Sequence, residues 1–245
     1  MNLTLDFGNT RVKSAVFDGN KCIHEYAYEK FSVKECETLL SMFQIKRAIV
    51  CSVTAIDSIL SEYLKTKFNP CIFLDSQTPI PIINAYKTPN TLGPDRIALA
   101  VAAHELHPEH SVLVVDAGTA LTYELIDETG KYLGGNIAPG ANMRLKSLHD
   151  YTHKLPLVSL SDTNSNIGSN TNDAILNGVV YGIAFEIDSY ISFLQSIYPN
   201  LLTFLTGGDA FFFAKKLKSS IFVSPNLLLI GLNCILNYNL CPVHE

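Results

Sequence analysis

The segment Leu5-Asp6-Phe7-Gly8-Asn9-Thr10 near the start of the chain is repeated in the second half as Val115-Asp116-Ala117-Gly118-Thr119. In both copies a strand-like run ends in Asp, a turn with Gly and Thr follows, and a second strand-like run returns. The spacing of the repeat is too long for stacked solenoid units. We therefore expect two homologous lobes, residues 1–110 and residues 111–245, with a boundary near His110.

Hydrophobic periodicity and turn residues divide each half into alternating strands and helices, which indicates an α/β protein. A proline- and asparagine-rich stretch, residues 77–94, is expected to be a long surface loop. The expected strands are residues 2–7, 11–17, a run from 21, 47–51, 112–115, 121–126, 131–137 and 201–205, with a short one near the C-terminus. The expected helices are residues 33–43, 56–67, 94–106, one after 140, 172–197, one after 209 and a final one.

Composition excludes several classes of protein. The 245 residues are 47% hydrophobic and 17% charged, enough for a large core. With 23 acidic and 18 basic residues the net charge is -5, which argues against nucleic acid or an anionic membrane as the main partner.

Targeting signals are not expected, and we predict a cytoplasmic protein. Asp6, Arg11 and Lys13 interrupt the first apolar stretch, which a secretory signal would not tolerate. The best apolar run, residues 227–236, is too short to span a bilayer and contains Asn233. The cysteines form no C-x-x-C pair and are interpreted as small buried side chains in a reducing compartment; they are Cys22, Cys36, Cys51, Cys71, Cys234 and Cys241.

The first glycine turn has the residues of a phosphate site. A carboxylate at the end of a strand, Asp6, can hold a hydrated Mg²⁺ while backbone N–H groups of the turn face phosphate oxygens. Lys13 on the returning strand could neutralise the same phosphates. An ordinary hairpin explains the segment equally well when it is taken alone. The segment is neither a P-loop nor a dinucleotide-binding fingerprint, because the carboxylate precedes the glycine.

A second candidate block is Tyr86-x-x-Pro89-x-x-Leu92-Gly93-Pro94-Asp95-Arg96. Asp95 falls in the first turn of an expected helix, where the helix dipole favours a carboxylate. It also follows a long loop, where a kinase can place the base that accepts a hydroxyl proton. Arg96 could bind a substrate carboxylate through two hydrogen bonds. Local sequence leaves both explanations of Asp95 open.

Taken together, the motifs resemble the type III pantothenate kinases, and the resemblance runs from end to end of the chain. Six blocks occur in the family's order, with no catalytic position substituted: residues 6–13, 86–96, 116–120, 135–140 followed by 155–156, 167–178 and 206–209. The resemblance implies a duplicated actin-like (ribonuclease H-like) fold with the active site in the cleft between the lobes.

The resemblance also implies a role for each matching position. Asp95 would accept the proton of the pantothenate hydroxyl as ATP converts pantothenate to 4′-phosphopantothenate, the first step of coenzyme A biosynthesis. Asp116 would bind a monovalent cation, K⁺ or NH₄⁺, and Asp6 would bind Mg²⁺ through water. The ATP and phosphate contacts would be Asp6, Gly8, Asn9, Thr10, Lys13 and Thr119. The pantothenate contacts would be Tyr86, Gly93, Pro94, Asp95, Arg96 and Thr171. The family works as a homodimer, and we expect the apolar helix over residues 174–194 to contribute to that contact.

Two alternatives are retained. One is another small-molecule kinase of the same fold, against which the block around Asp95 argues. The other is a regulatory or accessory protein that keeps the fold without turnover, against which the intact Asp6, Lys13, Asp95 and Asp116 argue. His104, His107 and His110 have metal-like spacing but lie near the expected end of a helix, where histidines complement the dipole.

Overall fold

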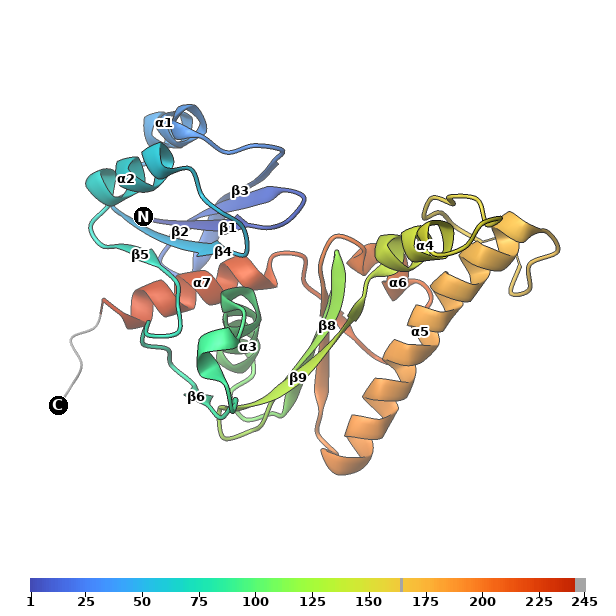
Figure 1. The fold of residues 1–245 in the computed structure, drawn as a ribbon. Coiled ribbons are helices and arrows are strands. Elements are labelled where there is room, and N and C mark those ends of the chain that lie inside the picture. The colour runs from blue at the N-terminus through green and yellow to red at the C-terminus, as the bar shows by residue number, and fades with distance from the viewer. Residues whose placement is uncertain (164, 241–245) are drawn as a thin grey trace. The chain divides into compact units, whose positions relative to one another are not determined.

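The computed structural model describes residues 1–163 and 165–240 (Figure 1). By its contacts the chain divides into two compact units. The first unit contains Met1–Glu109, Glu128–Leu133 and the C-terminal segment from Asn226, and the second contains His110–Asp127 and Gly134–Pro225.

The first unit is built on a sheet with strand order β3-β2-β1-β4-β5. Strand β1 runs antiparallel to β2 and parallel to β4, and β4 is parallel to β5. The strands are β1 (Asn2–Phe7), β2 (Val12–Asp18), β3 (Lys21–Tyr28), β4 (Arg47–Ser52) and β5 (Cys71–Phe73). Strand β6 (Ile83–Asn84) also belongs to this unit, but it pairs with the start of β9 (Lys131–Pro139). The helices are α1 (Val33–Met42), α2 (Ser58–Lys67), a 3₁₀ turn η1 (Pro89–Thr91), α3 (Pro94–Leu106) and α7 (Leu227–Tyr238).

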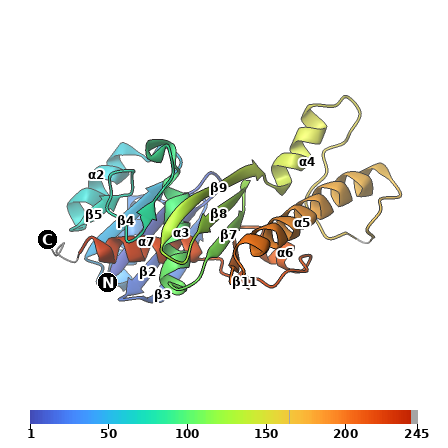
Figure 2. The same cartoon turned by 90° about the horizontal axis from the view of Figure 1, so that it is seen from below.

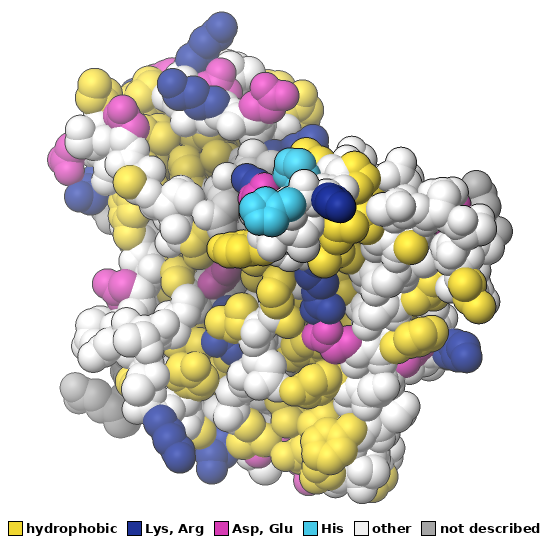
Figure 3. All heavy atoms as spheres, turned by 45° about the vertical axis from the view of Figure 1, so that its right-hand side comes forward, with side chains coloured by type: hydrophobic (Ala, Val, Ile, Leu, Met, Phe, Trp, Pro, Cys, Tyr) yellow, Lys and Arg dark blue, Asp and Glu magenta, His cyan; other side chains and the backbone are white. Residues whose placement is uncertain are grey.

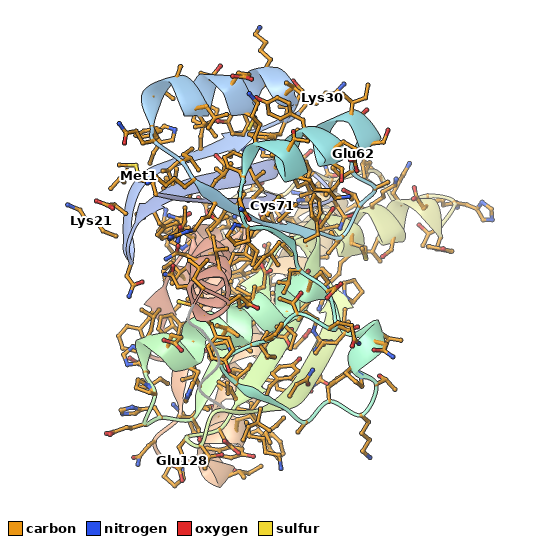
Figure 4. The ribbon with its side chains drawn as sticks, turned by 90° about the vertical axis from the view of Figure 1, so that its left-hand side faces the viewer. Met1, Lys21, Lys30, Glu62, Cys71 and Glu128 are labelled. Carbon is orange, nitrogen blue, oxygen red and sulfur yellow. The ribbon has the colours of Figure 1, made fainter. Side chains whose placement is uncertain are left out.

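Successive side chains of β1 point to opposite faces of the sheet. Leu3, Leu5 and Phe7 point into an apolar core shared with α1 and α2. Figures 1 and 4 show these two helices over one face of the sheet; in Figure 4 the labels Glu62 and Cys71 mark α2 and β5. On the opposite face, the buried Asn2 donates hydrogen bonds to Asn233 and to Asn237 of α7 (2.9 and 2.8 Å).

Helices α3 and α7 pack against each other at very short range. A Cβ added to Gly231 of α7 would stand 1.8 Å from the backbone oxygen of Ala98 in α3. The glycine is therefore required for packing, although in sequence it interrupts an apolar helix.

The second unit repeats the topology of the first. Its sheet has the order β6-β9-β8-β7-β10-β11, in which β9-β8-β7-β10-β11 corresponds to the order of the first sheet; β7 is antiparallel to β8 and parallel to β10, and β10 is parallel to β11. The strands are β7 (Val112–Ala117), β8 (Ala120–Ile126), β9 (Lys131–Pro139, of which residues 131–133 belong to the first unit), β10 (Leu202–Thr206) and β11 (Phe222–Val223). The helices are α4 (Ala141–Asp150), α5 (Thr171–Ile197) and α6 (Ala210–Ala214). Asp6 and Asp116 each occupy the fifth position of a six-residue strand with the same burial pattern. The internal repeat read from the sequence is thus a repeat of whole sheets.

Helix α5 is the longest element, and Figure 2 shows α4 beside its N-terminal part. It is the single described helix long and apolar enough to span a membrane by length and composition, and half of that apolar window is buried. Its buried side chains belong to the core of the second unit. We therefore interpret α5 as a core helix.

The expected loop over residues 77–94 contains two short elements that sequence did not indicate, β6 and η1. Strand β5 was also missed. Cys22, Cys36, Cys51, Cys71 and Cys234 are free, while Cys241 lies outside the described residues.

Candidate active site

The carboxylate of Asp6 lies at the carboxyl end of β1 between two in-register neighbours. Lys13 of β2 stands opposite it in the antiparallel pair, and Cys51 of β4 stands beside it in the parallel pair. Side chains at paired positions share one face of a sheet. The turn that follows is closed by the Gly8 N–H, which donates to the Arg11 carbonyl (3.1 Å). Asn9 and Thr10 of this turn are exposed.

Burial raises the pKa of Asp6 from 3.8 to about 6, against the opposing effect of the Lys13 ammonium. The charge of Asp95 adds to the increase. Asp6 and Asp95 also both raise the pKa of the buried Cys51, after burial itself. The structure therefore brings Asp6, Lys13 and Asp95 into one electrostatic cluster within the first unit.

Asp95 occupies the first turn of α3, whose N-cap is Gly93 and which has Pro94 at its first position. The Arg96 N–H donates to Asp95 Oδ1 (2.9 Å), so Asp95 does interact with the N-terminus of its helix. Burial nevertheless raises the pKa of Asp95, and its hydrogen bonds and the Arg96 charge only partly oppose this. A Cβ on Gly93 would lie 2.3 Å from Asp95 Oδ1. Glycine at position 93 thus leaves room for the carboxylate.

Tyr86 and Arg96 form a second pair next to Asp95. The guanidinium carbon of Arg96 lies 5.6 Å from the centre of the Tyr86 ring, within the range of a cation–π contact. Arg96 is only 6% exposed, so its charge is held away from bulk water. A buried guanidinium beside a half-buried aromatic ring is suited to bind a carboxylate.

In the second unit, Asp116 lies at the carboxyl end of β7. Its turn is closed by the Gly118 N–H, which donates to the Ala120 carbonyl (3.0 Å), and the Gly140 N–H donates to the Thr119 carbonyl (3.2 Å). The loop after β10 approaches from the other side: a Cβ on Gly207, which has φ +96°, would stand 2.3 Å from Asp116 Oδ1.

That same loop carries Asp209, whose backbone N–H donates to the Ala117 carbonyl (2.9 Å). Burial raises the pKa of Asp209. Sequence reasoning matched residues 206–209 to the family but assigned no site residue there. The parallel pairing of Thr206 with Asp116 is what brings the two loops together.

Thr171 begins α5 and lines a pocket of about 720 Å³ in the second unit. The N-cap Asn170 accepts a hydrogen bond from the Asp173 N–H (3.0 Å), which fixes the start of the helix. Arg144 of α4 lies on the pocket wall, where its guanidinium contacts Glu186 (2.7 Å). The pocket therefore combines an apolar wall with hydroxyl groups and one cation.

Direct protein ligands for a divalent metal are sparse. Among the described residues, no group of three His, Cys, Asp or Glu side chains could hold a metal ion. Mg²⁺ commonly keeps several waters and uses one or two carboxylates together with substrate phosphates. The single carboxylate of Asp6 beside a glycine turn fits that mode.

Comparison with known proteins identifies the family. The family model for type III pantothenate kinase matches residues 2–192. A type III pantothenate kinase of Bacteroides fragilis is 46% identical over 239 residues, covering 98% of both chains. The chain belongs to the type III pantothenate kinase family. A second member, from Christiangramia forsetii, is 42% identical over 241 residues, covering 98% of this chain and 99% of that one.

Solved structures agree on the fold alone. A putative Baf family transcriptional activator from Campylobacter jejuni has a TM-score of 0.60 at 23% identity, over 97% of this chain and 98% of that one. A putative 2-dehydro-3-deoxygalactonokinase from Sinorhizobium meliloti has a TM-score of 0.58 at 11% identity, over 99% and 100%. The fold is that of the actin-like kinases. As a type III pantothenate kinase, the protein is a phosphotransferase that phosphorylates pantothenate with ATP in coenzyme A biosynthesis.

Proposed function

We propose that Asp95 is the group that accepts the proton of the pantothenate hydroxyl during phosphoryl transfer. The observation that carries this proposal is its position: a buried carboxylate of raised pKa whose charge acts on Asp6, next to a buried arginine. A base with a raised pKa accepts a proton more readily near neutral pH. Its hydrogen bond from the Arg96 N–H to Oδ1 (2.9 Å) orients the carboxylate.

The phosphates of ATP are assigned to the first glycine turn and to Lys13. Backbone N–H groups around Gly8, Asn9 and Thr10 would donate to phosphate oxygens, and the Lys13 ammonium would neutralise charge. Asp6 would hold Mg²⁺ through water, and Mg²⁺ supplies charge neutralisation at the phosphates. Thr119 of the second unit is assigned a phosphate contact as well. The exposure of Asn9, Thr10 and Thr119 supports these roles.

Pantothenate carries a carboxylate and a flexible polar chain, and the residues assigned to it match that chemistry. Arg96 would bind the carboxylate with its planar fork, and Tyr86 would cover the ligand with its ring. Gly93 and Pro94 shape the backbone next to Asp95. Thr171, at the edge of its pocket, would add a hydroxyl contact.

Asp116 is assigned to a monovalent cation, K⁺ or NH₄⁺. It occupies the position that Asp6 occupies in the first unit, but Thr122 rather than a lysine stands opposite it. Carbonyl groups of the neighbouring loops could complete such a site.

A homodimer is proposed with α5 at its contact. Gly178, Gly182, Phe185 and Ser189 recur at helical spacing along one face. A Cβ on either glycine would meet no atom within 4 Å, and Phe185 is 59% exposed. Figure 3 shows hydrophobic side chains exposed on the face of the molecule that it brings forward. We take the occupant of this helix face to be a second copy of the chain. The proposed location of the protein is the cytoplasm.

The decisive experiment for the base measures ADP release with pantothenate in Asp95→Asn. The substitution keeps the shape and removes the proton acceptor, so kcat should fall by about 10²-fold or more while the melting curve stays native. Glu105→Gln, an exposed acid at the other end of α3, is the matched control and should turn over normally. Near-normal turnover of a folded Asp95→Asn would leave Asp95 with its helix-terminal role alone.

Two further measurements test the cation and the dimer. At constant ionic strength, KCl or NH₄Cl should activate the wild-type enzyme several-fold over a Na⁺ or Tris buffer, and Asp116→Asn should be poorly active and indifferent to K⁺. Full activity without K⁺ would contradict the cation role. Phe185→Asp should yield a monomer by light scattering, whereas Phe211→Asp, at a similarly exposed phenylalanine (62%), should not. A fully active wild-type monomer would contradict the dimer.

A further inference from the structure

The segment that carries Tyr86 is attached to the start of β9 by backbone pairing. Strand β6 runs parallel to β9, with Ile83 opposite Lys131 and Asn84 opposite Tyr132. The Ile83 N–H donates to the Gly130 carbonyl (2.9 Å), and the Ala85 N–H donates to the Tyr132 carbonyl (3.1 Å). All of these residues belong to the first unit. Hydrogen bonds to the start of β9 therefore fix the backbone from Ile83 to Ala85, the residue before Tyr86.

The side chain of Asn84 also fixes the backbone of Tyr86 itself. Its Oδ1 accepts a hydrogen bond from the Tyr86 N–H (3.0 Å). This is an Asx turn, in which a side-chain oxygen accepts from the backbone two residues later. The backbone N–H of Tyr86 thus has a fixed acceptor at the point where regular pairing ends.

The ring of Tyr86 is held by Tyr132. The two ring centroids are 6.2 Å apart with planes tilted by 35°, within the range of a favourable aromatic contact. Tyr132 is fully buried, so close packing restricts the orientation of its ring. The guanidinium of Arg96 lies over the Tyr86 ring, with its carbon 5.6 Å from the ring centroid. Tyr132, Tyr86 and Arg96 form a series of contacts that begins in the core and ends at the proposed substrate site.

We infer that Asn84 and Tyr132 are positioning residues that set the affinity for pantothenate by fixing Tyr86 and Arg96. The inference rests on the proposed assignment of Tyr86 and Arg96 to that substrate. A guanidinium that binds a carboxylate through two hydrogen bonds needs a fixed plane, and sites of this kind work only within about 10–20° of the productive orientation. If the Tyr86 ring can change its orientation, the Arg96 guanidinium loses the surface that fixes its own orientation.

The test compares two pairs of variants by the KM for each substrate. Tyr132→Leu removes the ring and Tyr132→Phe keeps it; Asn84→Ala removes the acceptor and Asn84→Ser restores a weaker one. We expect Tyr132→Leu and Asn84→Ala to raise the KM for pantothenate about tenfold, with the KM for ATP unchanged within about twofold. Phe at 132 and Ser at 84 should return most of the affinity. KM does not depend on the fraction of enzyme that is folded, and Asn84 is only partly buried, so its variants do not disturb the core.

Two controls separate the possible failures. Phe17→Leu, at a buried aromatic residue of β2, should lower the melting temperature and leave both KM values unchanged. Tyr86→Leu tests the site assignment directly and should raise the KM for pantothenate at least as much as Tyr132→Leu. If Tyr86→Leu has no effect on that KM, the assignment of Tyr86 to pantothenate is wrong. The positioning role is refuted if Tyr86→Leu raises the KM for pantothenate but Tyr132→Leu and Asn84→Ala do not. It is also refuted if Tyr132→Leu and Asn84→Ala raise the KM for ATP as much as the KM for pantothenate.

Discussion

Replacing Asp6 by Asn should make the nucleotide-free protein more stable at neutral pH while removing its activity. The carboxyl group of Asp6 ionises near pH 3.8 in an unfolded chain and near pH 6 in the fold, chiefly because burial disfavours the charge. At about 1.36 kcal/mol per pH unit, keeping Asp6 ionised costs the fold up to about 3 kcal/mol above pH 6. Asn has nearly the same shape and no charge to desolvate.

The sign of the pH dependence follows from proton binding. Between about pH 4 and pH 6 the folded protein holds a proton on Asp6 that the unfolded chain has lost, so this group's contribution to stability falls as pH rises through that window. Above pH 6 the penalty is constant. The advantage of Asp6→Asn should therefore be up to about 3 kcal/mol at pH 7.5 and about 1 kcal/mol at pH 4.5.

The assay is thermal unfolding followed by circular dichroism, without nucleotide or divalent cation. For a chain of this size 1 kcal/mol corresponds to roughly 2–4 °C, so a gain of up to about 3 kcal/mol should raise Tm by up to about 6–12 °C at pH 7.5. Asp18→Asn, at an exposed carboxylate of β2, should change Tm little at either pH. An Asp6→Asn variant that is no more stable than wild type, or whose advantage is the same at both pH values, would refute the reasoning.

Three other substitutions test separate parts of the molecule. Lys13→Ala should weaken ATP binding by roughly 10–100-fold in calorimetry with little change for pantothenate, because a charge-assisted hydrogen bond contributes about 1.5–3 kcal/mol; equal losses for both ligands would make Lys13 structural. Gly93→Ala places a methyl group 2.3 Å from Asp95 Oδ1, so kcat should fall about tenfold or more through displacement of the carboxylate, with Tm nearly unchanged; a normal kcat would show that the carboxylate position is not critical. Gly231→Ala forces α7 away from the Ala98 carbonyl and should destabilise the fold by about 3 kcal/mol, seen as a lower Tm in denaturation; a native Tm would show that the two helices can separate without cost.

Sequence reasoning succeeded where a pattern is local or repeated. The two Asp-Gly-Thr turns predicted a repeated strand unit, and the structure has two sheets that share the order of five strands, with β6 as an additional strand of the second sheet. Strands β5 and β6, with three and two residues, were missed because a run that short carries no readable alternation. Their existence depends on pairing with β4 and β9, which are distant in sequence.

The candidate site shows the same limit. Local sequence allowed two roles for Asp95, a carboxylate at a helix N-terminus or a base. The structure shows why spacing alone could not decide between them, because Asp95 accepts a hydrogen bond from the Arg96 N–H of its helix and its charge also raises the pKa of Asp6. Gly207 lay in a block that matched the family but was assigned no role, and Tyr132 reads as an ordinary strand residue. Each matters because of a neighbour far along the chain, Asp116 in one case and Tyr86 in the other.

The return of α7 to the first unit bears on how the chain folds as it is synthesised. The hydrogen bond from Asn2 to Asn233 joins residues 231 positions apart, and the face of the sheet that bears Asn2 has no α7 to cover it until residues 227–238 are made. A ribosome adds about 5–20 residues per second, so the N-terminal sheet waits roughly ten seconds or more with that face uncovered. The first unit is therefore completed long after its N-terminal sheet is made, and that sheet is exposed to aggregation until α7 covers it.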